Sequence, residues 1–274
     1  MYGAVIGDFV GSTREHVDIK GYTLDLTPPG SFFTDETVLM AATCQALLES
    51  QNTTSSDFAQ QYRKFVKQYP DAGYGLIFKD WAASNSNLPT HSSGNGCATR
   101  VIPIALLAKN EDQLITLARE SCLATHDHDD AIDHTCAVAL AVYLAGQGRA
   151  PEDIQKRIKL EYFISCEFDL EYLHRKYSFS ANCSDSVPQA IFCGLSANNY
   201  VDALRKGLYV GGDTDSILTI AGAIAQARFP DDQKLLELKA QVKKELVCKY
   251  QKIERIYDRF ERYLNAAQRL IKNV

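Results

Sequence analysis

Apolar residues recur at helical spacing along most of this chain, whereas the strict alternation of a half-buried strand is scarce. Several apolar segments are rich in alanine and apolar on most faces, which is typical of helices inside a bundle. Glycines at 146 and 148 ahead of Pro151, and Pro230 after Phe229, supply helix stops. The pattern therefore predicts an all-α protein. The predicted helices span residues 36–50, 98–108, 111–125, 133–148, 186–197, 200–210 and 216–229.

The last stretch, residues 231–274, is highly charged and carries leucines and isoleucines at heptad-like intervals. This pattern predicts one or two amphipathic surface helices. A dimerising helix stays open as an alternative, but the narrow apolar stripe favours a monomer. Because no repeat, low-complexity tract or linker divides the chain, we expect a single domain over residues 1–274.

Composition narrows the classes of protein to which the chain can belong. With 274 residues, 46% of them hydrophobic and 23% charged, it can bury a full core. A net charge of −5 argues against a nucleic-acid or anionic-membrane binder. No apolar run reaches the roughly 18–20 residues of a membrane span, and Asp8 interrupts any signal-peptide core. The eight cysteines are dispersed without a C-x-x-C pair, which indicates buried, reduced thiols in a cytoplasmic protein.

Two predicted helices begin with acids and hydroxyls, at "FTDET" (33–37) and "GGDTDS" (211–216). Each could be an ordinary N-terminal cap, in which acids favour the positive end of the helix dipole. The paired glycines of the second segment allow the sharp turn that would precede such a helix.

The two acid-bearing helix starts could also have a shared explanation. If they faced one another, Asp35, Glu36, Asp213 and Asp215 would repel strongly unless a cation lay between them. Carboxylate and hydroxyl oxygens suit hard divalent ions such as Mg²⁺, Mn²⁺ or Ca²⁺. An EF-hand does not fit, because Ile217 occupies the third ligand position of that loop. A paired-metal site assembled from distant segments is the remaining metal hypothesis.

Two glycine-bearing segments add further candidates. In "GDFVGSTRE" (7–15), glycines would allow a tight bend with Asp8 and Glu15 near its ends. In "HSSGNG" (91–96), glycines ahead of a helix can expose backbone N–H groups and so cradle a phosphate. This segment matches neither the Walker A nor the dinucleotide fingerprint, so a plain turn with a helix cap is the alternative.

The segment "ATHDHDDAIDH" (124–134) places three histidines among four aspartates. A zinc site is conceivable from His126, His128 and His134, but the spacing matches no familiar zinc motif. Exposed pairs four residues apart on a helix explain the same pattern without a metal.

Taken together, these segments resemble the ADP-ribosylglycohydrolase family. The resemblance runs in the family's order through "GAVIGDFVGSTRE", "FTDET", "SSGNG" with a following arginine, "THDH" and "GGDTDS" with "GAIAQA", over about residues 3–229. It implies a compact orthogonal bundle of helices with two Mg²⁺ (or Mn²⁺) ions in a central cleft. It also implies hydrolysis of the bond between ADP-ribose and a protein side chain or small acceptor. The partner would be an ADP-ribosylated protein or another ADP-ribose conjugate, with no membrane, and with nucleic acid only as an ADP-ribosylated substrate.

The resemblance assigns roles to individual residues. The metal ligands would be Thr34, Asp35, Glu36, Asp213, Asp215 and Ser216. The substrate-binding residues would be Ser92, Ser93, Gly94, Asn95 and Gly96 at the phosphates and His126 near the ribose. Glu15 matches the glutamate of the branch that hydrolyses serine-linked ADP-ribose. It is our first choice for the catalytic acid or base, with Asp35 second.

Two positions depart from the family pattern. Glu36 replaces the usual second aspartate, and Ser93 stands where many members carry an aromatic residue that stacks on adenine. Phe78 or Trp81 could supply a ring instead. These departures leave the acceptor undefined, and they keep a catalytically impaired ADP-ribose-binding protein as the alternative function.

Overall fold

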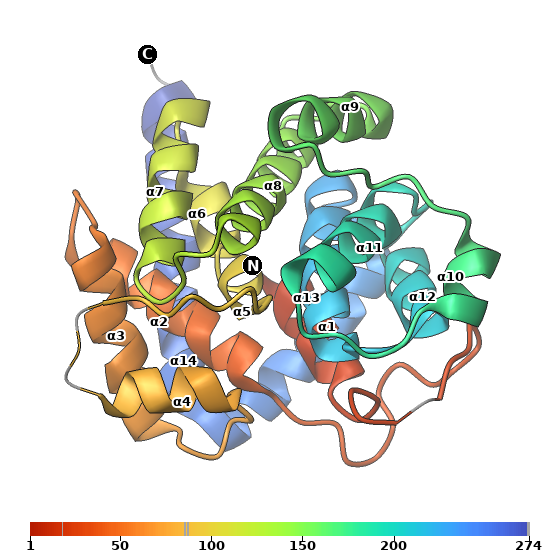
Figure 1. The fold of residues 1–274 in the computed structure, drawn as a ribbon, viewed down its shortest axis with the longest axis horizontal. Helices are drawn as coiled ribbons and strands as arrows, with labels where there is room; N and C mark the ends of the chain where they lie inside the picture. Colours follow the sequence, from red (N-terminus) through yellow and green to blue (C-terminus); the bar gives the residue numbers. More distant parts are fainter. Residues whose placement is uncertain (18, 85, 87, 273–274) are drawn as a thin grey trace.

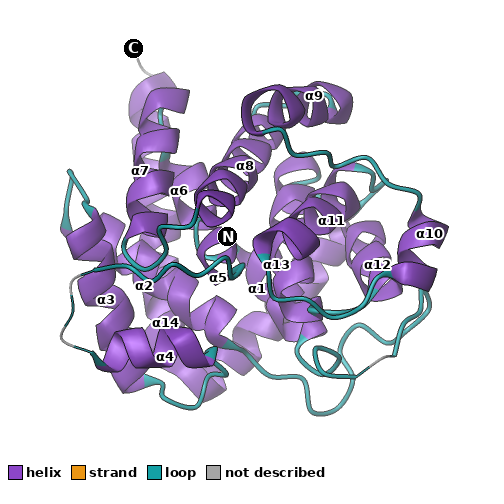
Figure 2. Ribbon diagram, viewed as in Figure 1, coloured by secondary structure: helices purple, strands orange, loops and turns teal. Residues whose placement is uncertain are grey.

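The computed structural model describes residues 1–17, 19–84, 86 and 88–272, with the side chains of 268–272 excepted. Over that part of the chain it is all-α, as predicted, and contains no strand beyond two isolated bridges between loop residues (Figure 2). The helices in chain order are α1 (Tyr2–Gly11), α2 (Asp35–Glu49), α3 (Ser55–Gln68), α4 (Leu76–Ala83), α5 (Gly96–Thr99), α6 (Ile102–Leu107), α7 (Glu111–Leu123), α8 (Asp129–Gly146), α9 (Pro151–Tyr162), α10 (Leu170–Lys176), α11 (Cys183–Leu195), α12 (Tyr200–Val210), α13 (Thr214–Arg228) and α14 (Gln233–Lys272).

Most predicted helices occur within a few residues of their expected bounds, but one prediction was wrong. The single helix expected over 98–108 is divided into α5 and α6. Pro103 lies at the start of α6, where it has no N–H to continue a helix from the preceding turn. The structure also contains α3, α4, α9 and α10, which the apolar pattern did not single out.

The bend expected over residues 7–15 was also wrong, because Gly7 and Gly11 lie inside the buried helix α1. Glycines four residues apart form one face of α1 that packs directly against the backbone of α13. A methyl group at Gly7 would collide with the carbonyl of Leu218, so these glycines serve close helix packing. The chain turns only from Ser12 onward, and that turn carries Glu15.

Helix α13 lies at the centre of the molecule, where it packs against α1, α8, α11 and α12 (Figure 1). It is buried over nearly its whole length, including Ile217, Leu218 and Ile224, none of which has exposed surface. Side chains from most of the other helices belong to the same apolar cluster. The dense packing gives a fixed base to the polar residues at the N-terminal end of α13.

The C-terminal region forms α14, which is two helical stretches joined at a non-helical residue, Tyr250 (φ −138°, ψ 55°). This agrees with the predicted one or two amphipathic helices. Val242, Leu246 and Phe260 are buried on the inner side, which packs against α1 and α2. In the described chain, no helix is both long enough and apolar enough to span a membrane. All eight cysteines are free thiols, and all but Cys248 are buried.

Candidate functional site

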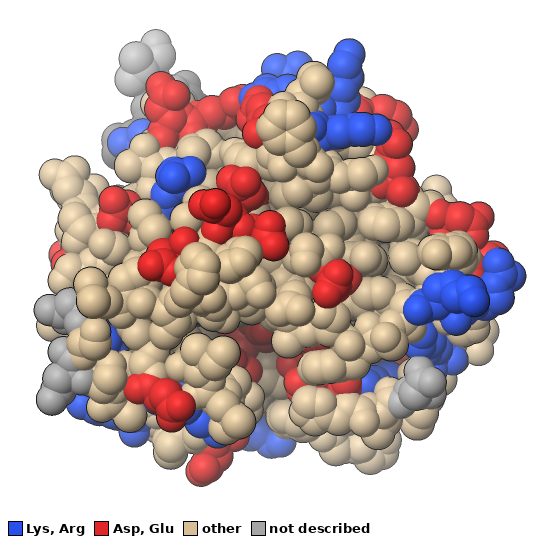
Figure 3. Space-filling model, viewed as in Figure 1, with Lys and Arg blue, Asp and Glu red and all other residues tan. Residues whose placement is uncertain are grey.

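A cavity of about 550 Å³ brings together segments that are far apart in the sequence. It lies among the turn after α1, the starts of α2, α4 and α13, and the loops at 90–96 and 179–182. The face drawn in Figure 3 is hollowed near its centre, with acidic atoms inside the hollow and mostly uncharged atoms around it. Every candidate site residue except Thr34 lines the cavity, namely Glu15, Asp35, Glu36, Ser92, Ser93, Gly94, Asn95, Gly96, His126, Asp213, Asp215 and Ser216.

The chain enters α13 through a turn that only glycine accommodates well. Gly211 and Gly212 both have positive φ, 74° and 78°. This turn delivers Asp213 to the N-cap position of α13, where it is 4% exposed. The side-chain amide of Asn95 donates a hydrogen bond to Asp213 Oδ2 at 2.7 Å, which ties the loop at 92–96 to the start of α13.

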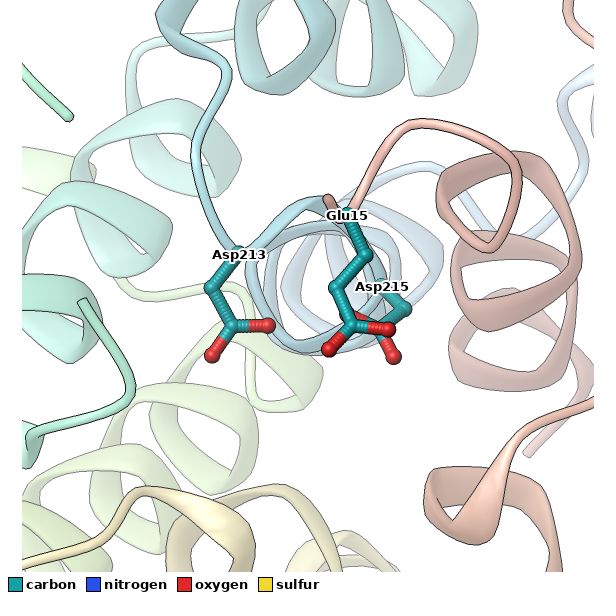
Figure 4. Close-up of side chains that lie close together, drawn as sticks. All are labelled: Glu15, Asp213 and Asp215. Carbon is teal, nitrogen blue, oxygen red and sulfur yellow. The ribbon is translucent and has the colours of Figure 1, made fainter. Parts of the chain in front are cut away.

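Glu15, Asp213 and Asp215 form a compact group of carboxylates, with one oxygen from each within 4.8 Å of the others. Figure 4 shows their carboxyl groups projecting to the same side of the start of α13. Burial, reinforced by the charge of Asp213, raises the pKa of Glu15 to about 7 and that of Asp215 well above its usual range. Asp215 Oδ1 is buried with no hydrogen-bond partner. A divalent cation would relieve both conditions, so this group is a possible metal site.

The start of α2 lies on another wall of the cavity. Thr34 is the N-cap, and its hydroxyl accepts a hydrogen bond from the backbone N–H of Glu36 at 3.2 Å, as the capping interpretation expects. Ser216 Oγ donates to Glu36 Oε1 at 2.8 Å and so links α13 to α2. The other Glu36 oxygen is buried without a partner. Burial raises the pKa of Glu36 well above its usual range and that of Asp35 to about 8.

Asp8 is a structural residue of the site, although the sequence pattern predicts only that it lies near the end of a bend. It has no exposed surface, and it accepts hydrogen bonds from the backbone N–H and the hydroxyl of both Thr34 and Thr37. These bonds fasten the first turn of α2 to α1. Burial raises the pKa of Asp8 to about 6 against the effect of the bonds. The signal in the sequence was a lone acid within an apolar, glycine-rich segment.

The residues assigned as metal ligands therefore lie in two groups on different walls of the cavity. Asp213 and Asp215 lie with Glu15, whereas Asp35 and Glu36 come from α2 on another wall of the same cavity. The Thr34 hydroxyl is engaged within the protein, because it also donates to Asp8 Oδ1 at 2.6 Å.

The loop at 92–96 is held in shape by its own polar groups. The Gly94 N–H donates to Ser92 Oγ at 3.1 Å, and the Asn95 N–H donates to Ala181 O at 2.8 Å. Ser93 Oγ donates to Asn182 Oδ1 at 3.0 Å, which joins the loop to the start of α11. Because α5 has only four residues, it supplies much less helix dipole than the longer helix we expected after this loop.

The three histidines of 124–134 have separate surroundings. His126 lines the cavity and is 6% exposed. His128 caps α8 by accepting from the Asp130 N–H at 3.1 Å, and His134 Nδ1 lies 2.7 Å from Asp130 O. Within the described residues, no group of three metal-ligating side chains includes a histidine, so the structure does not support the zinc interpretation.

Comparisons with known proteins extend over nearly the whole chain. The sequence model of the family described as ADP-ribosylglycohydrolase matches residues 1–269. ADP-ribosylhydrolase ARH3 of Homo sapiens is 28% identical over 313 residues, covering 85% of each chain. An uncharacterized protein of Archaeoglobus fulgidus is 26% identical over 272 residues, covering 86% of this chain and 89% of its own. A solved structure titled ADP-ribosylglycohydrolase-related protein complex has the same fold, with a TM-score of 0.63 at 20% identity over 88% of this chain and 93% of that one.

Proposed function

The chain belongs to the ADP-ribosylglycohydrolase family, and from that membership we propose that it hydrolyses the glycosidic bond between ADP-ribose and a protein side chain or small acceptor. The observation that best supports this proposal is the carboxylate group of Glu15, Asp213 and Asp215 in a cavity that the loop at 92–96 also lines. The name of the human relative, an ADP-ribosylhydrolase, points to the same class of reaction.

The cavity has the donor set that a pair of Mg²⁺ or Mn²⁺ ions requires. Five carboxylates line it, and Arg100 is the only lysine or arginine among its described lining residues. Buried oxygens of Asp215 and Glu36 have no partner. The ions would be held by Asp213, Asp215 and Ser216 on one side and by Asp35 and Glu36 on the other, with Glu15 adjacent, while Thr34 would hold the start of α2 from outside the cavity lining. When bound, they would supply Lewis-acid chemistry and orient sugar hydroxyls.

Glu15 is the residue that we assign to proton transfer. It comes from the turn after α1 and lies with Asp213 and Asp215 at the cavity, and in the metal-free protein burial raises its pKa to about 7. As a carboxylate it would take a proton from the attacking water, and as a carboxylic acid it would protonate the leaving group. Cleavage at the anomeric carbon builds oxocarbenium character, which the surrounding carboxylates would stabilise.

The remaining lining residues would hold the rest of the substrate. Ser92–Gly96 would face the diphosphate, with His126 beside the distal ribose. Phe78 and Trp81 both line the cavity, so either ring could stack on adenine where Ser93 offers none.

The test is a panel of ADP-ribose conjugates linked to arginine, serine, guanidine, acetyl and a nucleic-acid base. Release of ADP-ribose is followed with Mg²⁺, with Mn²⁺ and with a chelator. We expect release from at least one conjugate, suppressed by the chelator and reduced at least 100-fold in Glu15→Gln. Tight binding of ADP-ribose without release from any conjugate would instead identify a binding protein and overturn the proposal.

A further inference from the structure

Arg100 is a buried cation to which the proposed reaction assigns no role. It has no exposed surface and makes no ion pair with any described residue. Its guanidinium lies over the ring of Tyr62 at 4.3 Å and near that of Phe78 at 5.4 Å. Its Nε and Nη1 atoms have no hydrogen-bond partner. Because a buried charge without a carboxylate is costly, its retention beside the cavity calls for a specific role.

The contacts of Arg100 define the direction of a short hydrogen-bond chain. Arg100 Nη2 donates to Thr125 Oγ1, and the same hydroxyl lies 2.5 Å from His126 Nδ1. Thr125 is 1% exposed, and its hydroxyl has a single hydrogen to give. If Nδ1 carried the ring proton, that hydroxyl hydrogen would be buried beside a guanidinium without an acceptor. Thr125 therefore donates to Nδ1, and the ring proton of His126 lies on Nε2.

The Nε2 atom of His126 is directed at the loop of the cavity. A methyl group built on Gly94 would lie 3.7 Å from His126 Nε2 and 3.2 Å from Ser92 Oγ. Burial lowers the pKa of His126, with Cys97 opposing this and Arg100 adding to it, and the net lowering favours a neutral ring at neutral pH. A neutral imidazole with a fixed Nε2–H is a donor that needs no rearrangement when a ligand arrives.

We propose that Arg100 is a positioning residue that acts through the Thr125 hydroxyl to hold His126 as a fixed Nε2–H donor to an anionic or hydroxyl oxygen of the ligand. The choice of ADP-ribose as that ligand rests on the proposed function. Arg100 has no exposed surface but is among the residues that line the cavity, so its charge would also add attraction for a diphosphate.

The first measurement is the tautomer of His126 in the metal-free, ligand-free protein. Two-bond ¹H–¹⁵N spectra of histidine-labelled protein distinguish the two neutral tautomers, and His126→Gln assigns the signal among the six histidines. We expect the Nε2–H form in the wild type. A wild-type spectrum with the proton on Nδ1 would overturn the proposal directly, whether or not any variant folds.

The second measurement uses variants of the hydrogen-bond chain from Arg100 through Thr125 to His126, which we call the relay. Thr125→Val removes the hydroxyl at nearly constant shape, Thr125→Ser retains it, and Arg100→Met removes the cation. Thr219→Val is the matched control, since Thr219 is equally buried and its hydroxyl has no partner. We expect Thr125→Val and Arg100→Met to lose the single tautomer and to bind ADP-ribose about tenfold more weakly by calorimetry with Mg²⁺. Thr125→Ser and Thr219→Val should resemble the wild type.

The outcomes separate this proposal from the proposed function. A wild-type tautomer and affinity in Thr125→Val would overturn the relay even if the protein hydrolyses ADP-ribose conjugates. Conversely, the relay is supported if the wild type shows the Nε2–H tautomer and Thr125→Val loses it. That result stands even if no conjugate is hydrolysed.

Discussion

Asp215 illustrates how a single residue can be costly to the fold and useful to the site. It is 4% exposed, and one of its carboxylate oxygens has no hydrogen-bond partner. Burial and the neighbouring Asp213 raise its pKa well above the usual range. A group with these properties destabilises the metal-free protein unless it is protonated, which is the pattern expected of a residue retained for ligand binding.

At this scale we predict that Asp215→Asn weakens Mg²⁺ binding by about 100-fold or more without loss of fold. The amide has nearly the same shape as the carboxyl group and cannot ionise, so the thermal midpoint of the metal-free protein should stay constant or rise. Calorimetric titration and thermal unfolding check the two parts. Asp129→Asn, an exposed acid in the first turn of α8, should change neither quantity. Wild-type metal affinity in Asp215→Asn would rule out this metal site.

The contact between α1 and α13 depends on glycines, whose missing side chains let the two helices come close together. Gly3, Gly7 and Gly11 leave one face of α1 without side chains, and the backbone of α13 fills that space. The close approach places Asp8 against the start of α2 and the following turn, with Glu15, beside Asp215. Helix packing at this contact therefore sets the relative positions of three carboxylates.

We predict that Gly7→Ala destabilises the protein by about 3 kcal/mol, because its methyl group would meet the main chain at Leu218, which cannot move aside locally. Gly146→Ala is the control at the end of α8, where an added methyl group meets nothing within 4 Å. That variant should be neutral or slightly stabilising. Urea unfolding measures both changes, and similar midpoints for the two variants would contradict the packing argument.

At the scale of the whole molecule, the cavity gathers carboxylates whose pKa values are raised by a shared buried environment. Burial, with the neighbouring carboxylates, raises the pKa of Glu15 to about 7 and that of Asp35 to about 8. The folded protein therefore binds protons at a pH where the unfolded chain has released them. Stability contributed by these groups is lost as the pH rises toward their folded pKa values.

We predict that, with a chelator present, the urea midpoint of the wild type falls relative to Asp35→Asn as the pH rises from about 6.5 to 8.5. Mg²⁺ should abolish this relative fall, because a bound cation would stabilise the ionised carboxylates and favour the folded state. Equal pH dependence of the two proteins in chelator would show that Asp35 is not titrating in this range. Unfolding curves at several pH values, with and without Mg²⁺, provide the measurement.

Residues that act locally were the most predictable from sequence. The acid–hydroxyl segments at 34–37 and 213–216 begin helices as expected, because caps and glycine turns are short-range features. The glycines of α1 were misread, because a glycine in a turn and a glycine at a helix contact look the same along the chain. Arg100 and Thr125 both lie in segments that carry the resemblance, but the sequence does not show that they meet, since their hydrogen bond joins positions 25 residues apart.

The sequence by itself determined the helical character of this protein, the polar starts of α2 and α13, and the resemblance that the family match confirmed. Only the tertiary structure decided that Glu15 lies with Asp213 and Asp215, that Asp8 faces inward to hold α2, and that Arg100 reaches His126 through Thr125. The physical reason is the sequence separation over which each interaction acts. Helix periodicity and capping depend on residues within a few positions, whereas burial, carboxylate clustering and hydrogen-bond direction depend on which distant segments the packed core brings together.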